Sequence, residues 1–122
     1  MNGASKMVAL VAMVLALTAV ILAALGSHAI PMNGMQSSWQ AASNLHHFSA
    51  AAMIGLSALI AIYDSTLLRW GTWMIILGAV VFCGSIYTHV ITGYSLGAVT
   101  PSGGILMMLG WLVAAIAFLR KT

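Results

Sequence analysis

The chain has 122 residues, of which 62% are hydrophobic and 4% are charged, and its formal net charge is +3. A soluble globular domain carries about 25% charged residues, so a chain this apolar cannot cover a surface that faces water, and we expect a single-domain integral membrane protein. The few basic residues exclude an electrostatic footprint for nucleic acid, and the lone Cys83 excludes an internal disulfide.

The first apolar segment, residues 7–25, contains no charge and no helix breaker. It is long enough for a hydrocarbon core that needs about 20 residues. A cleaved signal peptide is the competing interpretation, because Lys6 precedes an apolar stretch that ends in small residues. The apolar run is longer than the signal-peptide core of about 7–15 residues, so we predict a membrane helix over residues 5–26 that ends at Gly26.

A polar segment over residues 27–38, with proline, asparagine and glycine as breakers, separates this helix from the next. We predict the second helix over residues 38–63, with Ser37 or Ser38 as its cap. Its first two turns are polar enough to lie in the membrane interface, and only its later part is strongly apolar.

A tight turn at Asp64, the only acid in the chain, precedes a third helix that we predict over residues 69–91. A short loop without charge follows. Thr100 is expected to be the N-cap of the fourth helix and Pro101 its first residue, because a proline at that position loses no hydrogen bond. We predict this helix over residues 101–120.

Four membrane helices place both termini on one side of the membrane. All cations of the chain fall on that side, namely Lys6, Arg69, Arg120 and Lys121. By the positive-inside rule, we predict that the termini and the turn between the second and third helices are cytoplasmic. The predicted fold is an all-α, integral membrane four-helix bundle in the bacterial inner membrane, with both termini cytoplasmic.

Small residues are expected to let the helices approach one another closely in lipid. Every predicted helix carries a pair at a spacing of four, as at Ala51 and Gly55. Oligomerisation is the alternative use of such pairs. The predicted helix-packing residues are Gly84, Ser85, Gly103, Gly104 and Gly110.

In this topology all four histidines lie at the end of the bundle opposite the cytoplasmic termini. Ionisable residues near the membrane are candidates for a functional site. Three interpretations stay open. In the first, the histidines are neutral interfacial side chains bonded to backbone carbonyls. In the second, together with Tyr87 or Thr88, they bind the head group of a lipid or quinone. In the third, they bind copper or zinc, with Met32 and Met35 as additional soft ligands for copper. The candidate ligand-binding residues are His28, His46, His47, Tyr87 and His89.

No catalytic constellation is found, so no enzymatic activity is expected. Ser85 has no acid near it, and the single acid, Asp64, lies at the opposite face. Gly103 and Gly104 stand at a helix start without the lysine and spacing of a nucleotide site.

Three motifs resemble a family of small bacterial membrane proteins called domain of unknown function 423, which is related to eukaryotic transmembrane protein 256. Residues 24–28 (Ala-Leu-Gly-Ser-His) are similar to the family's end of the first helix. Residues 82–87 (Phe-Cys-Gly-Ser-Ile-Tyr) and residues 100–104 (Thr-Pro-Ser-Gly-Gly), followed by Gly-Trp at 110–111, are similar to two further family motifs. The resemblance covers about residues 22–119.

The chain departs from the family pattern at the entry to the second helix. Trp39 fits, but Leu45 stands where the family carries a tyrosine. The family's histidine corresponds to His46 or His47, or is replaced by Ser49. The resemblance implies a four-helix inner-membrane protein and supplies no activity, because the family is named for lacking one.

The function predicted from these features is that of an accessory or assembly subunit of a larger membrane complex, or a homo-oligomer, without catalysis. Its predicted partners are the lipid bilayer and other membrane subunits or further copies of itself, and the sequence indicates no particular cofactor. The alternative is a protein that binds a lipid, a quinone or a metal at the outer histidines.

Overall fold

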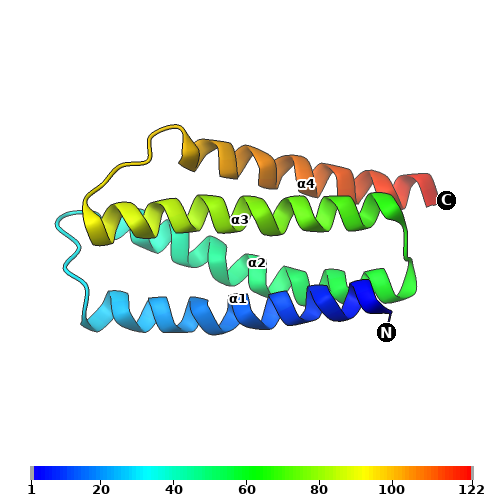
Figure 1. The fold of residues 1–122 in the computed structure, drawn as a ribbon, viewed down its shortest axis with the longest axis horizontal. Coiled ribbons are helices and arrows are strands. Elements are labelled where there is room, and N and C mark those ends of the chain that lie inside the picture. Colours follow the sequence, from blue (N-terminus) through cyan, green and yellow to red (C-terminus); the bar gives the residue numbers. More distant parts are fainter. Residues whose placement is uncertain (1, 122) are drawn as a thin grey trace.

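The computed structural model describes residues 2–121, and within them the chain forms four helices and no strand. The helices are α1 (Gly3–His28), α2 (Gln36–Ile62), α3 (Thr66–Thr92) and α4 (Val99–Lys121), and each is long and apolar enough to cross a membrane (Figure 1). The predicted all-α membrane fold is confirmed. The side of the membrane that the termini face stays a prediction.

Side-chain caps explain why α1 and α3 begin earlier than predicted. The Asn2 side-chain oxygen accepts the backbone N–H of Ser5 at 2.7 Å, and Ser65 Oγ accepts the backbone N–H of Leu68 at 3.1 Å. Each cap satisfies an N–H that has no partner within its own helix. Polar residues next to the apolar run therefore start both helices.

Two predicted caps were wrong. Helix α2 begins at Gln36 without a side-chain cap, so Ser37 and Ser38 lie inside its first turn. Helix α4 begins at Val99, so Thr100 and Pro101 are also helical. The proline is tolerated there because N–H groups in the first turn have no intrahelical partner.

Gly26 was predicted to end α1, but the helix continues to His28. Gly26 instead gives Trp39 of α2 room, because a Cβ at this position would lie 2.6 Å from the indole Cε2 atom. The glycine that ends a helix is Gly93, which has a left-handed φ of 78° and donates its N–H to the His89 carbonyl at 2.8 Å.

The helices pack in chain order, α1 on α2, α2 on α3 and α3 on α4, so α1 and α4 lie at opposite edges (Figure 1). Both described ends of the chain and the α2–α3 turn share one end of the molecule, which we call the inner end. The α1–α2 and α3–α4 loops share the opposite end, which we call the outer end. Lys6, Arg69 and Arg120 all belong to helix ends at the inner end.

Glycines on α3 and α4 bring these two backbones into contact. A Cβ on Gly71 would lie 2.8 Å from the carbonyl oxygen of Gly110, and a Cβ on Gly78 would lie 2.7 Å from that of Gly103. The two glycines are seven residues apart in each helix, so the same faces meet twice along antiparallel axes. Gly103 and Gly110 are predicted packing residues, whereas their partners on α3, Gly71 and Gly78, were not predicted from the sequence.

The other predicted packing residues differ in their surroundings. Ser85 Oγ lies 2.6 Å from Thr100 Oγ1 across the α3–α4 contact, and Gly104 faces the Phe82 ring at an ordinary distance of 3.5 Å from a built Cβ. Gly84 requires a correction, because a Cβ there would meet no atom within 4 Å. It does not pack against another helix of this chain.

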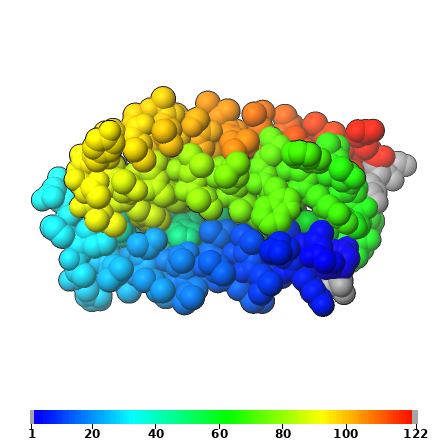
Figure 2. Space-filling model, in the orientation of Figure 1, coloured from blue at the N-terminus to red at the C-terminus, as the bar shows by residue number. Residues whose placement is uncertain are grey.

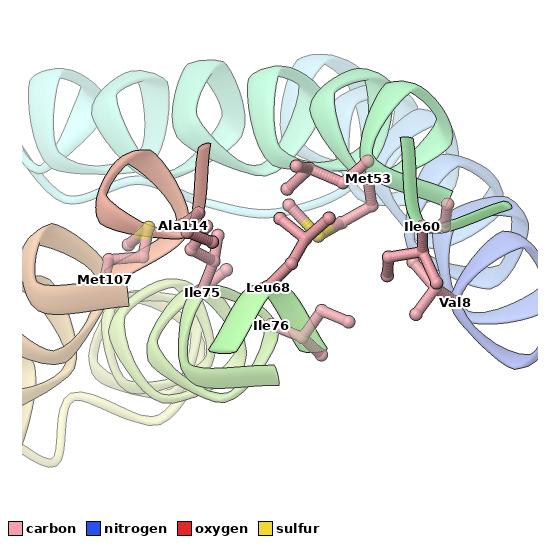
Figure 3. Close-up of a cluster of buried hydrophobic side chains, with 12 residues drawn as sticks. Val8, Met53, Ile60, Leu68, Ile75, Ile76, Met107 and Ala114 are labelled. Carbon is pink, nitrogen blue, oxygen red and sulfur yellow. The ribbon is translucent and has the colours of Figure 1, made fainter. Parts of the chain in front are cut away.

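Buried apolar side chains from all four helices form the core (Figure 3). Met53 and Ile60 of α2 are fully buried at its centre. The opposite face of α2 carries Ala51 and Gly55, which are exposed, and a Cβ on Gly55 would meet no atom within 4 Å. The prediction that this pair packs inside the bundle was therefore wrong.

Candidate functional site

The structure does not bring the four histidines together. His28 is exposed at the end of α1, and His89 is half-buried near the end of α3. The neighbours His46 and His47 point apart, since His46 is buried and His47 is exposed. Among residues 2–121, no three histidine, cysteine, aspartate or glutamate side chains lie close enough to hold a metal ion.

His46 is a buried link between three helices. Its Nδ1 lies 3.0 Å from the Tyr87 hydroxyl of α3, and its Nε2 lies 3.0 Å from Thr18 Oγ1 of α1. His46 follows the start of α2 by ten residues, which is about 15 Å along the helix axis. The pair of predicted ligand residues His46 and Tyr87 is thus bonded together well inside a membrane-spanning helix.

The hydrogen bonds assign the protons of this link. Thr18 Oγ1 lies 3.0 Å from the carbonyl oxygens of Val14 and Leu15, which can only accept. Thr18 therefore donates to its own helix and accepts the His46 Nε2 proton. This leaves His46 Nδ1 as the acceptor of the Tyr87 hydroxyl proton. In this arrangement every proton has an acceptor, and a neutral imidazole is sufficient to make both bonds.

Aromatic and sulfur contacts fix the same region. The Trp39 and Tyr87 ring centroids are 4.8 Å apart, and the Cys83 thiol donates to the Ala42 carbonyl at 3.3 Å. Cys83 is buried, in keeping with a small core residue. Because its polar atoms are all used inside the bundle, the Thr18–His46–Tyr87 link is best described as a brace between helices.

A shallow groove of about 170 Å³ separates α1 from α3 beside this brace. Leu15 and Leu22 line one side, Val80 and Gly84 line the other, and α2 forms the floor. Figure 2 shows α2 as a narrow strip between α1 and α3. Gly84 lines this groove, and its missing Cβ keeps the groove open.

A second cavity, which we call the outer pocket, lies between the end of α1 and the start of α2 and has a volume of about 310 Å³. Trp39, Met32 and Gly26 form part of its wall. Its polar lining consists of hydroxyl, amide and imidazole groups and contains no charged residue. These polar residues are Ser27, Gln36, Gln40, Ser43, Asn44 and His47.

Several hydrogen-bonding groups of the outer pocket have no partner within the part of the chain that the structure describes. Gln40 Nε2 donates to Asn44 Oδ1 at 2.8 Å, which leaves the Asn44 amide N–H groups and the Gln40 carbonyl oxygen. His47 Nδ1 donates to the Ser43 carbonyl at 2.7 Å, so its Nε2 is an acceptor in the neutral ring. Gln36 makes no side-chain hydrogen bond within residues 2–121. The pocket can therefore both donate to and accept from an uncharged polar group.

Sequence reasoning singled out the histidines and missed the amides around His47. The signal was available, because Gln36, Gln40, Ser43 or Asn44, and His47 recur at a spacing of three to four, which places them on one helix face. From the sequence, this polar face was interpreted only as the part of the second helix that lies in the membrane interface. Of the predicted ligand residues, the outer pocket contains only His47.

Comparison with known proteins identifies the family. The family model described as "Protein of unknown function (DUF423)" matches residues 22–104. The UPF0382 membrane protein of Staphylococcus epidermidis is 35% identical over 111 residues, which cover 86% of this chain and 88% of that protein. The UPF0382 inner membrane protein YgdD of Escherichia coli K12 is 33% identical over 109 residues, which cover 84% of this chain and 83% of that protein. No solved structure matches the chain.

These matches confirm the resemblance that the three sequence motifs indicated. They agree with the four membrane-spanning helices and with the predicted inner-membrane location. The chain belongs to the DUF423 family of uncharacterised membrane proteins and is a multi-pass protein of the inner membrane.

Proposed function

We propose that this protein binds a membrane-soluble molecule whose uncharged polar head group lies in the outer pocket. The observation that carries this proposal is the set of free donors and acceptors on Gln36, Asn44 and His47 around a cavity of about 310 Å³. Cavities that bind small molecules begin at about 300 Å³ and use a few placed polar groups for specificity.

The charge of the lining supports a neutral head group. No lysine, arginine or acid lines the outer pocket, so a phosphate or carboxylate there would be desolvated without a counter-charge. Hydroxyl and carbonyl groups match amide, hydroxyl and imidazole partners without that cost. A neutral lipid with free hydroxyls and a quinone both supply this chemistry.

The surface around the pocket supports a ligand with an apolar tail. Val20, three residues before the lining residue Ala23 on α1, is 61% exposed, and Ile54, seven residues after the lining residue His47 on α2, is 48% exposed. The helix faces that continue from the pocket into the membrane are therefore apolar and meet lipid. We propose binding without a chemical step. Asp64, the only acid, forms an ion pair with Arg69 at the opposite end of the bundle.

The test compares two histidines of the same end. Purified protein in mild detergent receives diacylglycerol, a short-chain ubiquinone or phosphatidylglycerol, and native mass spectrometry reports the bound fraction. We expect one of the two neutral probes to bind, and His47→Leu to weaken that binding about two- to tenfold through the lost acceptor. His28→Leu is the matched control, because His28 does not line the pocket. Equal losses in both variants, or no neutral binding at all, would contradict the proposal.

A second candidate function is that of a subunit that self-associates through α2. The exposed pair Ala51 and Gly55 supports it, because within residues 2–121 no other helix covers that small-residue face. The same spectra report the number of chains per particle. A multiple of the chain mass that Gly55→Leu reduces to a monomer is expected, and a monomeric wild type would exclude this candidate.

A further inference from the structure

A cavity of about 460 Å³ lies between the start of α3 and the end of α4. Both of these helix ends belong to the inner end of the molecule (Figure 1). We call this cavity the inner pocket. It differs from the outer pocket in its helices and in its chemistry. Its lining residues are Ser65, Thr66, Leu67, Trp70, Ala117 and Arg120.

Arg120 gives the inner pocket a cation that no acid among the described residues neutralises. Among the described residues, the only ion pair joins Arg69 to Asp64, with a second hydrogen bond from Arg69 Nε to Asp64 Oδ1 at 2.7 Å. Asp64 also accepts from Asn2 at 3.3 Å and does not line the pocket. Arg120 makes no hydrogen bond or ion pair within residues 2–121, so its planar guanidinium is available for an anion.

Two hydroxyl groups line the same pocket as this cation. Ser65 Oγ accepts the Leu68 N–H at 3.1 Å, which leaves the Ser65 hydroxyl proton free to donate. The Thr66 hydroxyl makes no hydrogen bond within the described residues. A guanidinium and two hydroxyl donors together match an anionic oxygen group such as a phosphate.

The remaining wall of the inner pocket is apolar and faces lipid. Trp70 is 65% exposed, and Leu67 and Ala117 extend the apolar wall between the two helices. A tryptophan at this position is typical of the level of lipid head groups. A soluble anion would leave this wall in contact with water, whereas an acyl chain would cover it.

We propose that the inner pocket binds an anionic phospholipid. Its phosphate contacts Arg120 and the hydroxyls of Ser65 and Thr66, and its acyl region lies against Trp70 and Leu67. Basic pockets between membrane helices on the cytoplasmic side bind such head groups, and the predicted orientation places this end there. The inference is independent of the proposed outer ligand, since the two pockets share no residue.

The test measures retained lipid on the full-length protein in mild detergent. Phosphatidylglycerol or phosphatidylcholine is added, and native mass spectrometry counts the bound molecules. We expect the wild type to prefer phosphatidylglycerol, and Arg120→Gln to reduce its retention about five- to tenfold. Thr66→Val, which removes a hydroxyl at nearly constant shape, should give a smaller loss.

Lys6→Gln is the matched control, because it removes one positive charge from the same end without touching the pocket. The side chains of Arg120, Thr66 and Lys6 are all exposed, so the three variants should keep the fold. Thermal unfolding of each variant checks this expectation. An equal preference for phosphatidylcholine would overturn the proposal. A loss in Lys6→Gln as large as in Arg120→Gln would also overturn it, because the attraction would then belong to the whole charged end.

Discussion

The two end pockets lie between neighbouring helices of one bundle, yet they differ in charge and in the helices that form them. The outer pocket belongs to α1 and α2 and is polar without charge, whereas the inner pocket belongs to α3 and α4 and contains Arg120. Both have hydroxyl groups, so hydroxyls do not distinguish them. On the two proposals made above, the presence or absence of one cation decides whether a pocket prefers an anionic or a neutral head group.

The largest expected effect tests whether the two pockets depend on different helix pairs. Gly71→Ala places a Cβ 2.7 Å from the backbone nitrogen of Ala114, and a backbone atom cannot move aside cheaply. We expect a loss of about 1–3 kcal/mol in the free energy of unfolding, together with loss of lipid from the inner pocket. Binding at the outer pocket should persist, because α1 and α2 are not touched.

Gly84→Ala is the matched control for this substitution. A Cβ at Gly84 meets no atom within 4 Å, so the variant should gain about 0.5–1 kcal/mol from the helix preference of alanine over glycine. Unfolding in detergent followed by circular dichroism measures both variants. Equal effects at the two positions would show that α3 and α4 do not meet through these glycines.

The next largest expected effect concerns the Thr18–His46–Tyr87 brace. His46→Leu leaves the Tyr87 hydroxyl without its acceptor inside a membrane helix, which should cost about 1–3 kcal/mol in the free energy of unfolding. Inner-pocket lipid should be retained at temperatures where the variant stays folded, since α4 takes no part in the brace. His47→Leu, at the exposed neighbour, should change stability by less than about 0.5 kcal/mol. A stable His46→Leu protein would show that the histidine is not a brace.

The smallest expected effect tests whether charge alone distinguishes the two pockets. Gln40→Arg places a cation in the outer pocket while a donor to Asn44 Oδ1 is kept. In an Arg120→Gln background, which lacks the inner cation, we expect about a fivefold gain in phosphatidylglycerol binding. Gln40→Met provides the uncharged control of similar length. No gain over Gln40→Met would show that the shape of the outer pocket, not its charge, excludes anionic lipids.

Much of the fold could be predicted from the sequence because the lipid bilayer restricts which backbone structures can cross it. Backbone polar groups in a bilayer must be satisfied internally, so long apolar segments become helices. The starts of α1 and α3 were placed late because the capping residues Asn2 and Ser65 are polar and lie outside the apolar runs. The packing role of Gly84 was wrong because a glycine in a membrane helix can face a partner helix or an open groove with the same sequence signature.

Less of the candidate sites could be predicted from the sequence. His46 and His47 are adjacent and chemically identical, yet one braces three helices and the other lines a pocket. A rotation of about 100° between consecutive helical residues separates their roles, and only the position of the neighbouring helices decides which of them is buried. The inner pocket needs Ser65 and Arg120, which are far apart in the chain and meet only because α3 and α4 run antiparallel.

The sequence by itself determined the membrane class, the four helices and the gathering of the basic residues at one end, because hydrophobic length and charge act locally along a chain. The tertiary structure alone decided which glycines touch another backbone, which histidine is buried, and that two chemically different pockets exist. These features depend on the relative rotation of packed helices. That rotation is set by the fit of all side chains together, and no single segment encodes it.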